Sequence, residues 1–272
     1  MKLNFFCDVD GTLLPFGKGL PESALKEIEK VQREGHRVFV ATGRNKKEMD
    51  PRLSVINFDG GVYSAGATVE YKNKEIFRKR MTESDISFLL SYAEKKSFYS
   101  LIQTDEGTYM TQESYDFFIS SMKKYIGGVI NVPNLIIYSG EFPKTHAPVC
   151  KFLFLSSEHK GEDMRTELKG KYQVVDNTVG LPQSDMAEIC QLGITKATGI
   201  KEMLKYLGED ISSSVAIGDG ANDNEMIEES GLGIAMGNAD DDVKRRADYV
   251  TTDVCDNGLK NALEYAITIN KK

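Results

Sequence analysis

The chain has 272 residues, 40% of them hydrophobic and 28% charged, with a formal net charge of −7, and this length allows one large domain or two smaller ones. The acidic balance without a basic tract argues against a nucleic-acid partner, and no apolar run reaches the roughly 20 residues that a membrane helix needs. The four cysteines are scattered and the first residues do not resemble a signal peptide, so we expect a cytoplasmic protein with reduced thiols.

The first predicted element is an apolar strand over residues 3–7 that ends in two carboxylates, Asp8 and Asp10. Alternation along a strand directs both acids to the same side. Two neighbouring acids repel each other unless a cation or a proton lies between them, and Mg²⁺ prefers oxygen ligands of this kind. The pattern therefore predicts a magnesium site and acid–base chemistry at the carboxyl end of this strand.

A predicted helix and a second strand follow. Apolar residues at helical spacing predict a helix that Ser23 caps and Gly35 ends. The next strand, over residues 38–41, stops at Thr42 and Gly43, whose hydroxyl and backbone N–H groups suit a phosphate oxygen. The elements expected next are a short helix over residues 46–53 broken near Pro51, a strand over 61–64 and a hairpin that turns at 72–74.

The composition changes at residue 81. Up to residue 183 the segment is rich in aromatic residues and alternates helix and strand patterns, but no strand in it ends in acids. The expected elements are a helix opened by Thr82 and Asp85, a hairpin of strands 98–103 and 108–111, a helix over 112–125, a strand over 149–155, a helix over 162–168 and a strand over 172–175. The segment therefore reads as an inserted α+β domain.

From residue 184 the chain is expected to return to the first domain, with a strand over 187–190 and a helix over 195–206. Another apolar strand then ends in the run GDGAND, residues 218–223, and short strands follow near 233–235 and 248–250. Three strand ends thus carry complementary chemistry: carboxylates that suit a metal and donors that suit a phosphate. The carboxyl ends of parallel strands near a topological switch point are where open α/β sheets bind ligands.

These motifs resemble those of the haloacid dehalogenase superfamily, and in particular its Cof-type phosphatases with a large α/β cap. GIAMGNA (233–239) and ADYVT (247–251) add to the resemblance, whose order and spacing extend along essentially the whole chain. The four catalytic motifs of the family are similar, in order, to DVDGT (8–12), Thr42-Gly43-Arg44, Lys196 and GDGANDNEM (218–226).

The resemblance implies an α/β fold with a Rossmann-like parallel-sheet core of residues 1–80 and 184–272. Residues 81–183 would be the inserted α+β cap, which selects the substrate. The chain departs from the family's pattern at Ala65, where Asn is frequent, and at Ala197, where Gly is frequent. Neither departure touches the catalytic carboxylates.

The resemblance also implies Mg²⁺-dependent hydrolysis of small phosphomonoesters, such as sugar phosphates or phosphorylated cofactors. Asp8 would attack phosphorus and form an aspartyl-phosphate, and Asp10 would protonate the leaving alcohol and later deprotonate water. Lys196 would offset the charge of Asp8 and the phosphate. The implied metal ligands are Asp8, the backbone carbonyl of Asp10 and Asp219, with Asp223 behind them orienting a metal-bound water or Lys196. The implied phosphate contacts are Val9, Thr42, Gly43, Lys196 and Asn222.

Two other functions stay open at this point. A phosphomutase has this kind of core and cap, and it would retain the phosphoryl group. A binding or regulatory protein would hold phosphorylated metabolites without turnover, but it is expected to lack Asp8 or Asp10, and both are present. The expected partner is a small phosphorylated metabolite, without nucleic acid or membrane, and we expect a monomer or a weak homo-oligomer.

Overall fold

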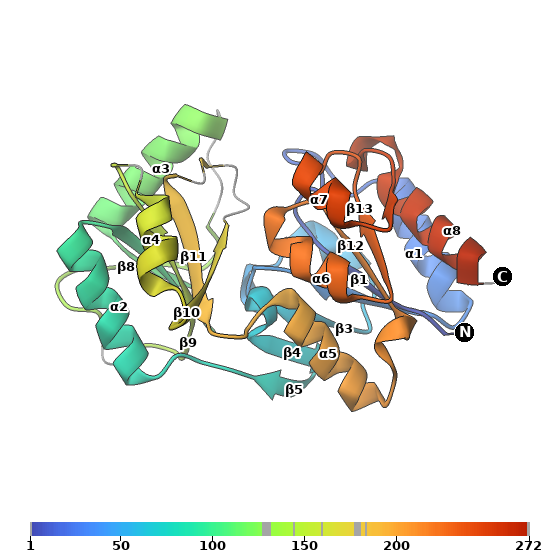
Figure 1. Ribbon diagram of the computed structural model, residues 1–272, viewed down its shortest axis with the longest axis horizontal. Coiled ribbons are helices and arrows are strands. Elements are labelled where there is room, and N and C mark those ends of the chain that lie inside the picture. The colour runs from blue at the N-terminus through green and yellow to red at the C-terminus, as the bar shows by residue number, and fades with distance from the viewer. Residues whose placement is uncertain are drawn as a thin grey trace. The chain divides into compact units, whose positions relative to one another are not determined.

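The computed structural model describes residues 2–126, 132–143, 145–158, 160–176, 181–182 and 184–270. The chain divides into two compact units, each with its own sheet (Figure 1). No helix in the described ranges is long and apolar enough to cross a membrane. The first unit consists of Met1–Gly43, Met49–Arg78 and Thr195–Lys272, and the second of Arg44–Glu48 and Lys79–Ile194.

The first unit is built on an eight-stranded sheet. Its strands are β1 (Asn4–Cys7), β2 (Arg37–Ala41), β3 (Gly60–Tyr63), β4 (Thr68–Tyr71), β5 (Lys74–Arg78), β12 (Ser214–Gly218), β13 (Leu232–Ala235) and β14 (Tyr249–Val250). Their order across the sheet is β14-β13-β12-β1-β2-β3-β4-β5. The strands from β14 to β3 are parallel, and β4 and β5 continue the sheet in antiparallel pairs. The parallel part is the α/β sheet that the strand patterns predict.

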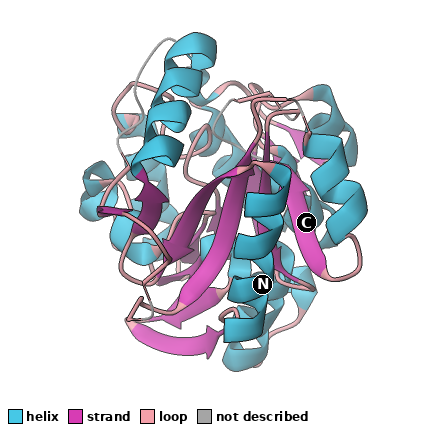
Figure 2. Ribbon diagram, turned by 90° about the vertical axis from the view of Figure 1, so that its left-hand side faces the viewer, coloured by secondary structure: helices cyan, strands magenta, loops and turns pink. Residues whose placement is uncertain are grey.

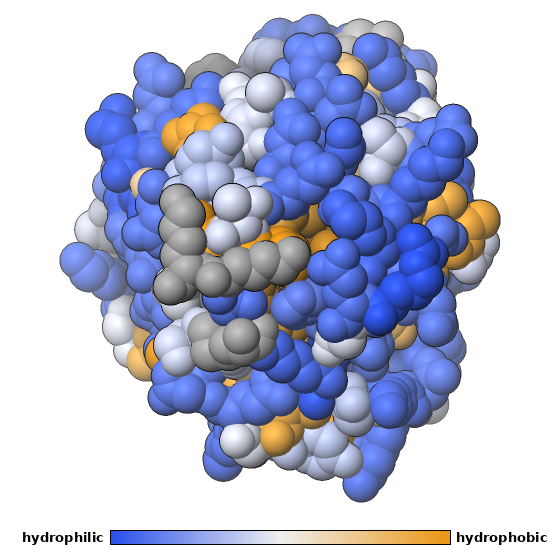
Figure 3. All heavy atoms as spheres, turned by 90° about the vertical axis from the view of Figure 1, so that its right-hand side faces the viewer, coloured by the Kyte–Doolittle hydropathy of each residue, from blue (hydrophilic) through white to orange (hydrophobic). Residues whose placement is uncertain are grey.

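Helices cover both faces of this sheet. They are α1 (Glu22–Arg33), α5 (Lys196–Leu207), α6 (Asn224–Glu229), α7 (Asp241–Arg246) and α8 (Gly258–Asn270). Phe5 on β1 packs in one core cluster with residues of α1 and α8, whereas its neighbour Phe6 packs in another with residues of α5 and α6. Central strands that are buried on both faces consist of continuous apolar runs, which is why the sequence predicts them. The face of the molecule in Figure 3 is mainly hydrophilic.

Two local expectations need correction, and two helices were not expected. Ser23 does not cap the first helix, because α1 begins at Glu22 and the extended Pro21 occupies the N-cap position without a side-chain hydrogen bond. The short helix expected over residues 46–53 with a break near Pro51 does break there, but it consists of two 3₁₀ segments, Lys46–Glu48 and Pro51–Val55, because proline interrupts the backbone bonding. The C-terminal helices α7 and α8 were not predicted.

The second unit has a six-stranded sheet and three helices. The helices are α2 (Glu83–Lys96), α3 (Gln112–Ile126) and α4 (Gly161–Leu168). The strands, in their order across the sheet, are β10 (Tyr172–Asp176), β11 (Met186–Gln191), β9 (Val149–Leu155), β6 (Tyr99–Thr104), β7 (Thr108–Thr111) and β8 (Leu135–Tyr138). Phe152 and Phe154 on β9 pack with residues of α2 and α4, and Leu153 between them packs with residues of α3. Figure 2 views the structure from the side of this unit and shows helices beside its strands. The unit therefore has helices against both faces of its sheet.

Strand β11 belongs to the second unit, although the sequence placed residues 187–190 in the first domain. It pairs antiparallel with both β9 and β10. The assignment of this strand to the first domain was therefore wrong. A short apolar run predicts a strand, but it does not indicate which strands pair with it. The chain returns to the first unit only at Thr195.

The segment Arg44–Glu48 is also part of the second unit. The buried carboxylate of Glu48 accepts hydrogen bonds from the Thr108 hydroxyl (2.6 Å) and the Gln103 amide (2.7 Å). The Asn45 amide donates to the carbonyl of Thr104 (2.9 Å). These bonds attach to the second unit the five residues that directly follow Gly43.

Candidate active site

The carboxyl end of β1 carries Asp8 in a tight turn. Asp8 continues the parallel pairing with β12 through its N–H, which donates to the carbonyl of Ile217 (2.9 Å). The carbonyl of the buried Val9 then accepts the N–H groups of Leu13 and Leu14 (3.1 and 2.8 Å), which closes the turn. The Asp8 side chain is buried and that of Asp10 is half-buried. The turn thus presents both acids at the end of the central strand.

Lys196, the first residue of α5, reaches two of the predicted acids. Its ammonium lies 2.6 Å from Oδ1 of Asp8 and 2.6 Å from Oδ1 of Asp223. All three side chains are buried. Burial alone lowers the pKa of Lys196, but the carboxylates of Asp223 and Asp8 outweigh it, so its pKa is raised and the lysine stays charged. A fixed cation therefore lies beside Asp8.

Asp219 follows β12 and joins this cluster. A carboxylate oxygen from each of Asp8, Asp219 and Asp223 lies within 4.8 Å of one from each of the others. Oδ1 of Asp219 accepts from the Thr12 hydroxyl (2.8 Å). Burial raises the pKa of Asp219 to about 7, and the charge of Asp223 adds to the effect. Burial also raises the pKa of Asp8 well above its ordinary value, against the opposing effect of Lys196. A bound cation would reduce the repulsion among carboxylates that lie this close together.

The donor set of the cluster fits Mg²⁺, which binds carboxylate oxygens and keeps several waters. Asp223 makes three hydrogen bonds within the site, because Oδ1 accepts from Lys196 and Oδ2 accepts the N–H groups of Asp219 and Gly220 (both 3.0 Å). Asp8 and Asp219, which accept fewer bonds from charged or backbone groups, are the side chains best placed to hold the ion. Asp223 instead orients Lys196 and the loop that carries Asp219.

The residues predicted to contact phosphate lie at the same edge of the sheet. Strands β12, β1 and β2 are adjacent and parallel, so their carboxyl ends meet there. Thr42, just after β2, is buried and donates its N–H to the carbonyl of Val62 (2.8 Å), and Gly43 is half-buried. Asn222 lies in the short 3₁₀ segment after β12, and its Oδ1 is buried without a hydrogen-bond partner in the described residues.

Two side chains of this site were not among the predicted site residues. Thr12 lies inside the first motif, and its hydroxyl binds Asp219. Asn238 follows β13, and its amide donates to the carbonyl of Gly11 (2.9 Å) and lies 3.4 Å from Oδ2 of Asp219. The run GIAMGNA drew attention to the segment, but nothing in its pattern distinguishes a turn asparagine from one that contacts an acid 19 residues away.

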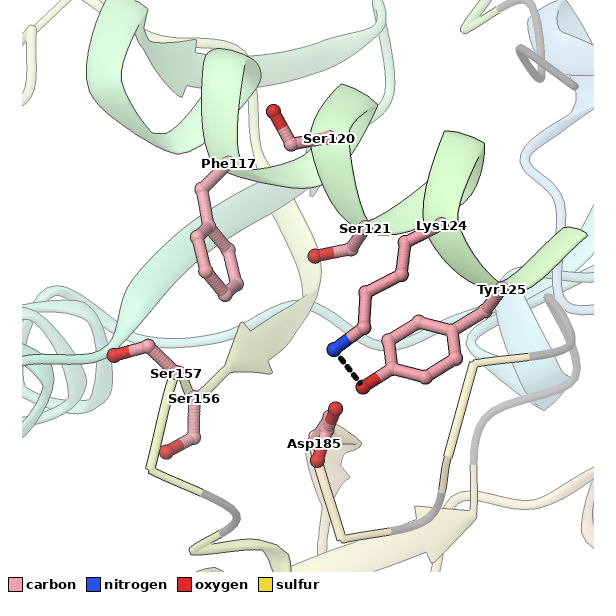
Figure 4. Close-up of a pocket in the computed structure, with 8 residues that line it drawn as sticks. All are labelled: Phe117, Ser120, Ser121, Lys124, Tyr125, Ser156, Ser157 and Asp185. Atoms are coloured by element: carbon pink, nitrogen blue, oxygen red, sulfur yellow. Dashed lines mark hydrogen bonds between the residues drawn. The ribbon is translucent and has the colours of Figure 1, made fainter. Parts of the chain in front are cut away.

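The second unit contains a separate cavity of about 200 Å³. Figure 4 shows that Lys124 and Tyr125, hydrogen-bonded to each other (2.8 Å), extend from α3 with their polar ends toward Asp185. None of the predicted catalytic, metal or phosphate residues lines it, so this cavity is not the predicted catalytic centre. Its lining residues are Phe117, Ser120, Ser121, Lys124, Tyr125, Ser156, Ser157 and Asp185.

Known proteins resemble this chain over nearly its whole length. "Putative phosphatase YkrA" of Bacillus subtilis (strain 168) is 30% identical over 97% of this chain and 96% of its own. "5-Amino-6-(5-phospho-D-ribitylamino)uracil phosphatase YcsE" of the same organism is 26% identical over 95% and 93%. The solved structure of BT1666 from Bacteroides thetaiotaomicron, described among phosphatases of the haloalkanoate (HAD) enzyme superfamily, is 25% identical with a TM-score of 0.82 and covers 97% of this chain and 95% of its own.

The sequence pattern of a known enzyme family spans both units. A model of the haloacid dehalogenase-like hydrolases matches residues 5–263. The matched range includes Asp8, Asp10, Lys196, Asp219 and Asp223. Of these, Asp8, Lys196, Asp219 and Asp223 lie close together in the structure. The chain therefore belongs to the haloacid dehalogenase-like hydrolases.

Proposed function

We propose that this hydrolase is a Mg²⁺-dependent phosphatase that acts on small phosphomonoesters through an aspartyl-phosphate on Asp8. The observation that carries the proposal is the contact of Asp8 with Lys196 beside the acids Asp219 and Asp223. A carboxylate attacks an anionic phosphate poorly unless positive charge offsets the repulsion. When bound, Mg²⁺ would neutralise charge on the phosphate oxygens and on Asp8.

Each residue has a distinct task in this proposal. Oδ1 of Asp8 is engaged by Lys196, so Oδ2 is the oxygen available to attack phosphorus. As the P–O bond to the leaving group breaks, Asp10 gives that oxygen its proton. Asp10 then takes a proton from the water that attacks phosphorus, which breaks the bond to Asp8 and releases inorganic phosphate. Thr42, Gly43 and Asn222 would donate hydrogen bonds to the phosphoryl oxygens.

The proposed substrates are sugar phosphates or phosphorylated cofactors, and the second unit is proposed to select among them. Binding energy from the non-reacting part of a substrate can raise the rate of the chemical step. The relative YcsE is named for a phosphorylated ribitylaminouracil, so compounds of that class belong in the panel of candidate substrates. A phosphomutase is the second candidate on the same residues, and it would return the phosphoryl group to a substrate hydroxyl.

The test is release of inorganic phosphate from a panel of sugar phosphates and phosphorylated cofactors, in Mg²⁺ and in EDTA. We expect release in Mg²⁺ that EDTA abolishes. Asp8→Asn should lower turnover by about a thousandfold or more, because it removes the nucleophile. The exposed Asp256, changed to Asn, is a matched control that should leave turnover unchanged. Full activity in EDTA, or Asp8→Asn turnover near that of the parent, would refute the mechanism; isomerised products without free phosphate would indicate a mutase.

A further inference from the structure

Asn238 joins three segments of the candidate site. Its Nδ2 donates to the carbonyl of Gly11 (2.9 Å) and lies 3.4 Å from Oδ2 of Asp219. Its Oδ1 accepts the N–H of Val254 (2.9 Å). The bond from Val254 determines which end of the amide points to the site, because an N–H can face only the oxygen. The amino group of Asn238 is therefore directed at Gly11 and Asp219.

The carboxylate of Asp219 is held from two sides. The Thr12 hydroxyl donates to Oδ1 (2.8 Å), and the Asn238 amide faces Oδ2. Gly11, with φ of +88°, lies so close that a Cβ added to it would be 2.1 Å from Oδ2 of Asp219. No side chain fits between the turn after β1 and this acid. A hydrogen bond to the Gly11 carbonyl thus restrains the distance between the two loops.

A neutral donor suits this position. A lysine or arginine would also orient the carboxylate, but its positive charge would repel a cation bound to the same acid. An amide leaves the negative charge of Asp219 available and limits its orientation. Groups that hydrogen-bond to metal ligands orient them in this way, and their loss typically weakens metal binding by about 10-fold to 100-fold.

We propose that Asn238 is a positioning residue that holds Asp219 and the Gly11 turn in the arrangement that binds Mg²⁺. This rests on the proposed function, in which Asp219 is a metal ligand. Asn238 itself touches neither the substrate nor the ion in this proposal. It acts through Asp219 and through the backbone next to Asp10.

The test is Mg²⁺ binding by the full chain, measured by calorimetry without substrate, for the parent and Asn238→Ala. The control is Asn261→Ala, because Asn261 also donates a side-chain hydrogen bond, to Thr252 Oγ1 (2.8 Å), away from the acids. We expect Asn238→Ala to weaken Mg²⁺ binding about tenfold. The melting temperature in EDTA should fall by no more than about 4 °C, because only the hydrogen bonds to Gly11 and Val254 are lost at this exposed side chain. Saturating Mg²⁺ should restore most of the parent kcat, and Asn261→Ala should bind Mg²⁺ like the parent.

The outcomes separate this inference from the proposed function. If the parent binds Mg²⁺ and releases phosphate while Asn238→Ala binds Mg²⁺ equally well, only this inference is overturned. If the parent itself binds no Mg²⁺, the proposed function and this inference both fail. Should Asn238→Ala not fold, Asn238→Ser is measured by the same criteria, and loss of folding in both variants would show a purely structural residue and overturn the inference.

Discussion

Removing the charge of Asp219 should make the metal-free protein more stable at alkaline pH. Asp219→Asn keeps the size of the side chain and an oxygen that accepts from Thr12. It removes one of the acids that crowd the carboxyl ends of β1 and β12. In the parent, burial and the charge of Asp223 raise the pKa of Asp219 from 3.8 to about 7. The folded state therefore loses stability when this acid ionises.

The sign follows from proton binding. Between pH 3.8 and about 7 the folded parent holds a proton on Asp219 that the unfolded chain has released. The free energy of unfolding of the parent thus falls as the pH rises through this range. A difference of about three pH units corresponds to about 4 kcal/mol at most. Because Asp219 keeps partial contact with water, we expect about half of that, roughly 2 kcal/mol.

Thermal melts in EDTA at pH 4.5 and pH 8, with and without Mg²⁺, test this reasoning. At pH 8 in EDTA, Asp219→Asn should melt about 4–8 °C above the parent, since about 1 kcal/mol moves a protein of this size by about 2–4 °C. At pH 4.5 the difference should be only about a quarter as large, because about 0.7 of the roughly three pH units has then been crossed. Mg²⁺ at about 100 times its dissociation constant should stabilise the parent by about 2.7 kcal/mol and the variant by less.

The exposed acid Asp256 is the matched control, and Asp256→Asn should show no pH-dependent gain. Two results would refute the reasoning about the cluster. One is an Asp219→Asn variant no more stable than the parent at pH 8 in EDTA. The other is a gain of equal size at pH 4.5 and pH 8, which would have to come from something other than ionisation.

Three further outcomes are expected. Asp10→Asn should retain more of the parent kcat on p-nitrophenyl phosphate than on a sugar phosphate, because nitrophenolate leaves without a proton; equal losses in a phosphate-release assay would contradict the proton-donor assignment. Glu48→Ala should lower the free energy of unfolding by about 2–4 kcal/mol in denaturant titrations, since it leaves the buried donors of Gln103 and Thr108 unpaired, and a loss below about 0.5 kcal/mol would show that these bonds contribute little. Replacing Lys79–Ile194 by a short linker should lower kcat/KM steeply for the best natural substrate but much less for acetyl phosphate, and equal losses would mean that the second unit does not set specificity.

The parts of the fold that the sequence predicted well are those where local pattern and tertiary burial agree. The strands β1, β2 and β12 are apolar because both faces of the sheet are covered. Each is followed by polar residues to which the proposed function assigns a role. The C-terminal helix α8 also carries a helical pattern, with Leu259, Ala262, Leu263, Ala266 and Ile267 all buried. The spacing of these apolar residues is itself enough to predict a helix. The strands that pair with β11 could not be predicted from the sequence, since pairing depends on residues far along the chain.

The sequence predicted those residues of the candidate site that the order of the strands alone brings together. Adjacent parallel strands bring Asp8 and Asp219 to one edge, whichever side chains surround them. The contact between Lys196 and Asp8 spans 188 positions, and only the combined motifs suggested it. No combination of motifs indicates the contacts of Asn238, because these contacts depend on the conformation of two turns. The sequence pattern does not predict which side chain orients another.

The segment Arg44–Glu48 changes how the two units are connected. The crossings expected near residues 80 and 184 would leave Thr42, Gly43 and the residues after them wholly within the first unit. In the structure the chain leaves the first unit directly after Gly43 and is held in the second by Glu48 before it returns at Met49. Any movement of the second unit must therefore change backbone torsions next to Thr42 and Gly43, as well as those at Arg78 and Ile194. Because Thr42 and Gly43 are the proposed phosphate contacts, this covalent connection would link the proposed substrate selection in the second unit to phosphate binding in the first.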